Sequence, residues 1–185
     1  QLCASFHPPR YPVQAREIFE VLPLPDNLCT AGVHEHHRRA GLGRVLVGHR
    51  EAVRTDVEHR NQISLLHLPQ AKFGVLICFE IIFPDLCRRF VKNGADFLVT
   101  ITNDAWFGRT SAPHQHFTIA VFRAIENRVF VARAANTGIT GFIDPRGKII
   151  KKGEIFTEEA MNGTIRLSKK KTFYTLYGDV FAWVC

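Results

Sequence analysis

The chain has 185 residues, of which 46% are hydrophobic and 22% are charged; these values are typical of a globular domain and exclude a wholly disordered chain. No run reaches the ~18 uninterrupted apolar residues that would cross a membrane, so no transmembrane segment is predicted. The formal net charge of +7 is uneven, because residues 1–62 hold 8 Arg and 7 acidic residues (+1), and residues 63–185 hold 16 basic and 10 acidic residues (+6). The short lysine runs behind this excess are interpreted as a solvated face, and no nucleic-acid partner is predicted.

The cysteine and histidine patterns exclude two further classes of protein. The chain has five cysteines with neither C-x-x-C spacing nor a paired framework: Cys3, Cys29, Cys78, Cys87 and Cys185. A disulfide scaffold and a zinc ribbon are therefore not predicted. His34, His36 and His37 form a short cluster without a cysteine or carboxylate pair at ligand spacing, so neither a metal nor another cofactor is predicted.

The first 62 residues differ from the rest. They contain no lysine and three aromatic residues, whereas residues 63–185 contain eight lysines and most of the phenylalanines. Residues 30–62 show neither the alternation of a strand nor the periodicity of a helix. Residues 1–62 are therefore left as a separate, unassigned segment, and we hypothesise that a frameshift in the gene between residues 10 and 62 explains them. With no initiating Met and no signal peptide, the sequence is expected to be part of a longer protein.

From residue 63 the pattern is that of alternating strands and helices. Lys72–Cys78 is predicted to be a buried strand. Pro84 opens a helix over Asp85–Asn93, which ends at Gly94. Asp96–Thr102 is a second buried strand, so the unit is a parallel strand–helix–strand crossover.

The remaining elements follow a polar loop, Asn103–Ala112. Thr110 or Ser111 is expected to cap a helix that enters through Pro113 and ends near Arg128. Three strands and a hairpin turn then complete an α/β layered domain: strands Val129–Arg133 and Gly138–Ile143, the turn Asp144–Gly147 leading into Lys148–Lys151, and a last strand Gly163–Leu167.

Polar and aromatic residues gather where the predicted strands end. Loops at the carboxyl ends of parallel strands converge on one crevice, so these residues are candidates for one site: Cys78, Glu80, Asn103, Trp106, Phe107 and Asn136. Taken singly, each has a plain structural interpretation. A lone cysteine usually packs as a small hydrophobe, Glu80 can pair with Arg88 or Arg89, and Trp106 and Phe107 can be lid-loop aromatics or core.

Taken together, these residues resemble a known family. Three segments carry the resemblance, GVLICFEIIFPDLCRRFVKNGADFLVTITNDAWFG, SAPHQHFTIAVFRAIENR and RAANTGITGFIDPRGKI. From residue 63 onward the chain resembles the C-terminal half of the carbon–nitrogen hydrolase (nitrilase) domain, and within that superfamily it is similar to the apolipoprotein N-acyltransferases; residues 1–62 do not match. The ending FYTLYGDVFAWVC is similar to the approach to their last membrane helix.

The resemblance implies a nitrilase-like αββα sandwich, represented here by its C-terminal half, and a Glu–Lys–Cys triad. It implies that Cys78 is the nucleophile and that Glu80 supports it. The backbone N–H of Phe79 would bind the oxyanion. With Phe79, the substrate-binding residues are expected to be Asn103, Trp106, Phe107 and Asn136. It also implies a phospholipid acyl donor, an apolipoprotein acceptor, and a place at the bacterial inner membrane facing the periplasm.

The sequence departs from the family in its first part. The family's lysine lies some tens of residues before the cysteine, whereas Lys72 is the sole lysine before Cys78. The triad glutamate is also unmatched, since nothing around Glu17 or Glu20 fits its motif. The chain alone is therefore expected to fold only partially and to be inactive. Two alternatives stay open: a soluble amidase or nitrilase, and a non-catalytic fragment whose basic face binds lipid or nucleic acid.

Overall fold

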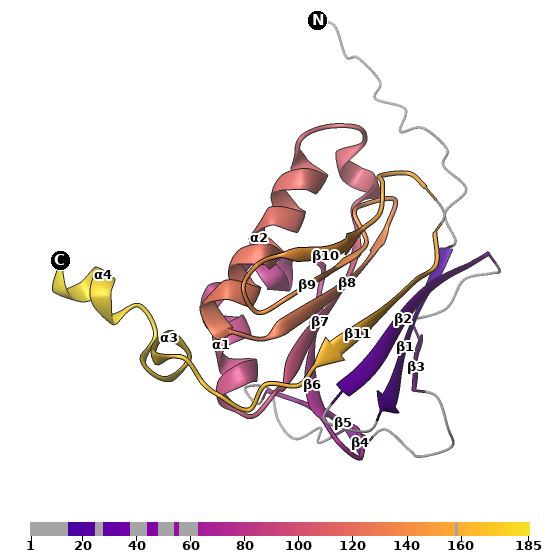
Figure 1. Cartoon of the computed structure of the whole chain (residues 1–185). Helices are drawn as coiled ribbons and strands as arrows, with labels where there is room; N and C mark the ends of the chain where they lie inside the picture. Colours follow the sequence, from indigo (N-terminus) through magenta and orange to yellow (C-terminus); the bar gives the residue numbers. More distant parts are fainter. Residues whose placement is uncertain (1–14, 25–27, 38–43, 48–53, 56–62, 158) are drawn as a thin grey trace, which may run out of the picture.

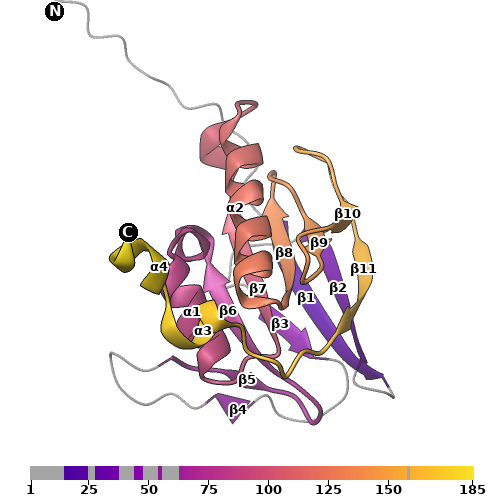
Figure 2. The same cartoon turned by 60° about the vertical axis from the view of Figure 1, so that its left-hand side comes forward.

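A computed structural model describes residues 63–157 and 159–185 with their side chains, and residues 15–24, 28–37, 44–47 and 54–55 by their backbone. Within these residues, two β-sheets pack face to face (Figure 1). Helices α1 (Pro84–Lys92) and α2 (Ala112–Asn127) cover the outer face of the larger sheet (Figure 2). The described chain is thus a mixed-sheet α/β fold with a helix layer on one side, as the sequence predicts.

The larger sheet brings the predicted strand ends together. Its described strands lie in the order β10-β9-β8-β7-β6-β5-β4, and β6, β7 and β8 run parallel. The register pairs Ile77 with Ile101 and Asn103 with Asn136, so the carboxyl ends of the parallel strands meet at one edge. The strand bounds are β4 (Arg54–Thr55), β5 (Leu66–His67), β6 (Lys72–Ile77), β7 (Phe97–Asn103), β8 (Phe130–Asn136), β9 (Gly141–Ile143) and β10 (Ile149–Lys152).

The β6–α1–β7 unit is the strand–helix–strand unit predicted from the sequence. Helix α1 begins at Pro84, whose fixed φ suits the first helical turn. The chain leaves the helix through Gly94, which adopts a left-handed φ of +110°. Gly74 allows α1 to approach β6 closely, because a Cβ at that position would lie 2.4 Å from the Phe90 ring.

Helix α2 is also confirmed, and of the two predicted capping residues Thr110 makes the hydrogen bond. The residue before the helix is Ser111, but its side chain makes no cap hydrogen bond. The hydroxyl of Thr110 accepts a hydrogen bond from the Ala112 N–H instead, at 3.3 Å. Phe117 and Ala124, seven residues apart, are both buried against the sheet. This spacing places them on one face of the helix.

The hairpin β9–β10 is present, but the strand before its turn is shorter than predicted. The sequence predicts a strand over Gly138–Ile143, whereas β9 begins at Gly141. The chain bends before that point, because Thr137 has a φ of +58° and the Thr140 hydroxyl accepts a hydrogen bond from the Ala135 N–H at 3.2 Å. The bend takes Gly138 toward the site described below.

The smaller sheet contains strands from residues 1–62, the segment that the sequence analysis left unassigned. Its described strands lie in the order β11-β2-β1-β3, with bounds β11 (Met161–Arg166), β2 (Leu28–His37), β1 (Ala15–Leu24) and β3 (Arg44–Val47). Residues 1–62 therefore do supply strands of the second sheet, which the sequence pattern did not indicate. These strands pair over long registers without strict apolar alternation, and such pairing depends on tertiary context more than on local propensity. The frameshift, and the domain boundary at residue 62, stay hypotheses.

Apolar packing fills both faces of the larger sheet. Between the sheets, Phe73 and Phe97 stack with their ring centroids 5.0 Å apart, and Ile165 of β11 packs in the same cluster. The other cluster joins the sheet to α1 and α2 and includes Leu76 and Phe117. The parallel strands are thus held from both sides, as all-apolar strands of α/β folds are.

The C-terminal residues form two short helices, α3 (Phe173–Tyr177) and α4 (Val180–Val184). Helix α3 lies beside α1 and α2, and its Thr175 hydroxyl donates to Asn127 Oδ1 at 3.0 Å, whereas α4 points away from the helix layer (Figure 1). Phe181 and Trp183 are 81% and 89% exposed. Among the described residues, no helix combines the length and apolar character that a membrane span needs.

Candidate active site

Cys78 lies in a sharp turn directly after β6. The strand ends at Ile77, and a 3₁₀ helix, η1 (Cys78–Ile82), starts at the cysteine itself. Cys78 has a φ of +52°, which costs a residue with a Cβ roughly 1–2 kcal/mol. Its thiol is half-buried and free. A strained, accessible thiol at the carboxyl end of a parallel strand is a candidate for function, not for packing.

Glu80 closes the same turn. One oxygen of its carboxylate, Oε2, accepts a hydrogen bond from the backbone N–H of Ile77 at 2.7 Å. The alternative in which Glu80 pairs with Arg88 is wrong, because Arg88 Nη2 contacts Asp85 Oδ1 at 2.5 Å. Glu80 therefore fastens the residues on either side of Cys78, which agrees with a supporting role.

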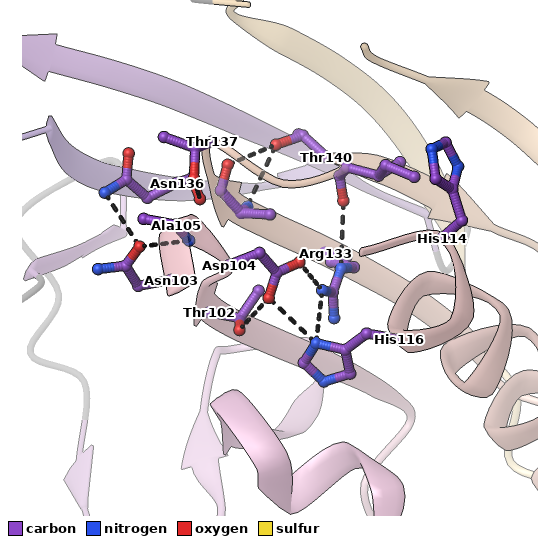
Figure 3. A network of polar contacts seen from close by, with 12 residues as sticks. Thr102, Asn103, Asp104, Ala105, His114, His116, Arg133, Asn136, Thr137 and Thr140 are labelled. Carbon is purple, nitrogen blue, oxygen red and sulfur yellow. Dashed lines mark hydrogen bonds and ion pairs between the residues drawn. The ribbon is translucent and has the colours of Figure 1, made fainter. Parts of the chain in front are cut away.

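Asn103 and Asn136 meet at the ends of β7 and β8. The Asn103 Oδ1 accepts hydrogen bonds from the Ala105 N–H at 3.1 Å and from Asn136 Nδ2 at 3.4 Å. The Asp104 N–H donates to the Asn136 carbonyl oxygen at 3.2 Å. The two predicted site loops are therefore joined directly, as Figure 3 shows.

Beneath these loops lies a buried polar network that the sequence analysis missed (Figure 3). Asp104 Oδ2 accepts from Arg133 Nη2 at 2.7 Å, and Asp104 Oδ1 accepts from the Thr102 hydroxyl at 2.9 Å. His116 Nδ1 lies 3.0 Å from Asp104 Oδ1 and 3.1 Å from Arg133 Nη2. All three ionisable side chains are buried.

The partners of Asp104 keep its carboxylate ionised although it is buried away from water. Burial alone raises the pKa of Asp104, but the hydrogen bond from His116 and the charge of Arg133 outweigh it, so the pKa lies below its ordinary value. Gly138 approaches from the next loop, and a Cβ there would lie 2.3 Å from Asp104 Oδ2. The glycine of the Asn-Thr-Gly segment thus leaves room for this carboxylate.

Aromatic side chains connect the network with the Cys78 turn. The Phe79 ring stacks on the His116 ring with a centroid distance of 5.6 Å, and Phe107 meets both rings edge-on. Phe79 is 52% exposed and Trp106 is 84% exposed. The interpretation of Trp106 as core is therefore wrong, and the exposed Phe79 ring gives the region beside Cys78 an apolar surface.

Lys72 does not belong to this site. It begins β6, at the end opposite to Cys78, and its backbone N–H donates to Asp96 Oδ2 at 2.8 Å. Within the described residues, no group of three or more His, Cys, Asp or Glu side chains is placed to hold a metal ion. His34, His36 and His37 belong to β2, but their side chains lie outside the description.

The chain is similar in sequence to known proteins. The sequence profile of the carbon-nitrogen hydrolase family matches residues 10–173. Since the match covers most of the chain, the chain belongs to the carbon–nitrogen hydrolase family. The match reaches into residues 1–62, which the sequence pattern had left outside the family.

Within this family, the chain is similar to curated apolipoprotein N-acyltransferases. An apolipoprotein N-acyltransferase of Geobacter metallireducens is 55% identical over 124 residues, which are 67% of this chain and 24% of that protein. The apolipoprotein N-acyltransferase of Borreliella burgdorferi is 44% identical over 124 residues, 65% of this chain and 23% of that protein. The chain thus spans about a quarter of the length of the curated relatives it matches.

Solved structures of the nitrilase superfamily are similar at lower identity. A Saccharomyces cerevisiae member of its branch 10 is 22% identical with a TM-score of 0.49, and the alignment covers 81% of this chain and 58% of that one. An amidase from Nesterenkonia is 16% identical with a TM-score of 0.47, over 85% of this chain and 61% of that one.

Proposed function

We propose that this chain is the nucleophile-bearing part of an enzyme that moves an acyl chain from a phospholipid to the N-terminal cysteine amine of apolipoproteins. The main support is Cys78, a half-buried thiol in a left-handed turn at the carboxyl edge of the parallel sheet. The relatives named apolipoprotein N-acyltransferase, at 55% and 44% identity, favour this reaction over others of the family.

The reaction has two halves. Cys78 loses its thiol proton and attacks the ester carbonyl of the phospholipid as a thiolate; a C–S bond forms, the ester C–O bond breaks, and the lysophospholipid leaves with the proton that the thiol lost. The free amine of the acceptor then attacks the thioester, a C–N bond forms, the C–S bond breaks, and the amine proton goes to the sulfur. A cysteine suits this scheme, because it is strongly nucleophilic and amines attack its thioester readily. The Phe79 N–H would stabilise the oxyanion in both halves.

The other predicted site residues shape the space around the sulfur. Glu80 holds the turn through its hydrogen bond to the Ile77 N–H. Asn103 and Asn136 fix the neighbouring loops to each other. The exposed ring of Trp106 offers apolar area for an acyl chain, and Phe107 extends this area toward Phe79.

A membrane location belongs to the same proposal. The substrates are lipids, and the side chains of Phe173, Phe181 and Trp183 are 66%, 81% and 89% exposed along the C-terminal segment. Aromatic residues of this kind favour the boundary between lipid and water. We place the protein at the bacterial inner membrane with the site facing the periplasm.

The isolated 185-residue chain is expected to be inactive. Lys72, the sole lysine before Cys78, begins β6 at the far end of the strand. Without a cation at the family's lysine position the oxyanion loses a stabilising charge, and removing one such donor alone lowers rates by about 10²–10³.

A transfer assay tests the proposal. A full-length protein carrying this chain is given phospholipid with a labelled acyl chain and a lipid-modified peptide with a free N-terminal cysteine amine. Label is expected in the peptide, and none in a matched peptide whose amine is acetylated. Turnover of small amides without transfer to any amine would instead identify a soluble carbon–nitrogen hydrolase. Lipid binding without turnover, unchanged by Cys78→Ala, would identify a non-catalytic lipid-binding fragment.

A further inference from the structure

We infer that Asp104, His116 and Arg133 are positioning residues for Cys78: they fix the His116 ring against Phe79, and Phe79 holds the left-handed turn in which Cys78 lies. This inference rests on the proposed role of Cys78 as nucleophile. It assigns a task to three buried residues that do not take part in the acyl-transfer steps described above.

The network begins with a fixed carboxylate. Asp104 is 1% exposed and Arg133 is 0% exposed, and Arg133 Nη2 donates to Asp104 Oδ2 at 2.7 Å. Arg133 Nε also donates to the Ile139 carbonyl oxygen at 3.1 Å, which ties the guanidinium to the loop after β8. A buried ion pair with these additional hydrogen bonds has one arrangement, since any other would leave a charge unpaired out of water.

His116 is held at one nitrogen. Its Nδ1 lies 3.0 Å from Asp104 Oδ1 and 3.1 Å from Arg133 Nη2, and the ring is 4% exposed. A carboxylate only accepts and a guanidinium only donates, so Nδ1 carries the proton when it bonds to Asp104. Nε2 has no hydrogen-bond partner among the described residues. The ionic partners therefore fix the ring at Nδ1 and leave its face for packing.

That face carries Phe79. The two rings stack at 23° with centroids 5.6 Å apart, and the Phe107 ring lies 6.2 Å from Phe79 and 6.4 Å from His116. Phe79 is 52% exposed, so burial in the core does not set its position. The rings of His116 and Phe107 contact the Phe79 ring and restrict its position.

Asp104 controls the second ring as well. Its carbonyl oxygen accepts from the Phe107 N–H at 3.1 Å and so starts the 3₁₀ turn η2 (Ala105–Phe107). Phe79 follows Cys78 directly in the chain. The turn is also held by the hydrogen bond from the Ile77 N–H to Glu80 Oε2 at 2.7 Å, by the backbone of η1, and by the Phe83 N–H, which donates to the Glu80 carbonyl oxygen at 3.2 Å. Loss of the aromatic contacts would let Cys78 relax toward an unstrained φ.

Amide hydrogen exchange of the full-length protein tests this. In His116→Ala, exchange at the Ile77 N–H, which reports the closed turn, is expected to rise at least tenfold more than exchange at the amides of β7, which reports the loss of overall stability. His114→Asn is the matched control, because His114 is an exposed residue of the same helix. It is expected to change neither. Unchanged exchange at Ile77 in His116→Ala, or an equal rise at Ile77 and throughout β7, would overturn the inference.

A second variant covers the case in which His116→Ala fails to fold. Phe79→Leu removes the stacked ring at a half-exposed position and leaves the buried network intact. It is expected to raise Ile77 exchange as His116→Ala does, and Phe79→Tyr is expected to restore the original rate. If Phe79→Leu leaves the rate at Ile77 unchanged, the link from Phe79 to the turn does not exist.

An activity readout separates this inference from the proposed function. In the full-length protein, His116→Ala is expected to lower kcat for acyl transfer at least tenfold with KM within about twofold, since the substrate surface remains and the thiol is misplaced. A change in KM with normal kcat would contradict positioning. If neither parent nor variant transfers acyl groups, the proposed function fails, whereas the exchange result still decides the inference.

Discussion

Two cysteines nine residues apart lie in opposite surroundings. Cys78 is half-buried in a left-handed turn at the sheet edge, whereas Cys87 is fully buried in α1. The Cys87 thiol points toward the Ile81 carbonyl oxygen at 3.7 Å, and burial raises its pKa to about 12. A thiol with such a pKa stays protonated and unreactive. The residue type is therefore uninformative alone, and the backbone conformation together with the neighbours selects the reactive cysteine.

The two surroundings are also stabilised in different ways. The helix around Cys87 is held by apolar packing, because its residues Cys87, Phe90 and Val91 share one buried cluster with Leu76 and Phe117. The region around Cys78 depends on the buried ion pair of Asp104 and Arg133 and on exposed aromatic rings. An apolar core tolerates modest change, whereas a buried network with one partner missing is strongly destabilised.

Replacing each cysteine in turn should give the largest difference in activity between the two surroundings. In the full-length protein, Cys78→Ala should abolish acyl transfer, because no thioester can form, and expression and folding should stay near normal. Cys87→Ala should retain most of the activity, with a modest loss of stability from the smaller buried side chain. Acyl transfer that survives Cys78→Ala would refute the assignment.

Removing a partner of the buried ion pair should have the largest effect on stability. Arg133→Met leaves the Asp104 carboxylate buried without its main cation, and the free energy of unfolding should fall by about 3–5 kcal/mol. Urea denaturation of the full-length protein measures this. A change below about 1 kcal/mol would show that the pair does not support the region, as is common for surface pairs.

Trp106→Ala should separate function from stability. The side chain is 84% exposed, so the unfolding free energy should change by less than about 0.5 kcal/mol. Turnover of lipid substrate should fall, because the ring supplies apolar area next to Phe107. Normal turnover together with a stability loss of about 3–5 kcal/mol would mark Trp106 as core.

The pH dependence of stability gives the smallest expected effect. The folded pKa of Asp104 lies below its unfolded value of about 3.9, so its ionised form contributes stability that is complete above that pH and is lost as pH falls through the folded pKa. The difference in unfolding free energy between the wild type and Asp104→Asn should be constant from about pH 7 to pH 5 and shrink below about pH 4. Asp96 and Glu126, whose pKa values are raised by burial, occur in both proteins and cancel. A difference that is constant down to about pH 3 would contradict the assignment.

Local patterns predicted the elements around Cys78 well. Apolar runs, Pro84 and Gly94 placed β6, α1 and β7 to within about a residue, because each signal acts within a single turn or strand. Their position at the ends of predicted parallel strands placed Asn103 and Asn136 at one edge, and the register of β7 and β8 pairs these two residues there.

Features that depend on distant pairing could not be predicted. The ten-residue pairing of β1 with β2 leaves no clear period in the sequence. The partnership of Asp104, His116 and Arg133 joins a loop, a helix and a strand, and nothing local to any one of them indicates burial. The left-handed φ of Cys78 could not be predicted either, because a glycine is the usual sequence signal for that conformation and none is present at this position.

Capture of the acyl-enzyme tests the central claim most directly. The full-length protein is incubated with a labelled phospholipid, quenched before the peptide acceptor is added, digested, and mapped by mass spectrometry with and without hydroxylamine. The proposal predicts one acyl group on the peptide that contains Cys78, removed by hydroxylamine and absent from Cys78→Ala. An acyl group on any other residue, or turnover without a hydroxylamine-sensitive adduct at Cys78, would contradict it.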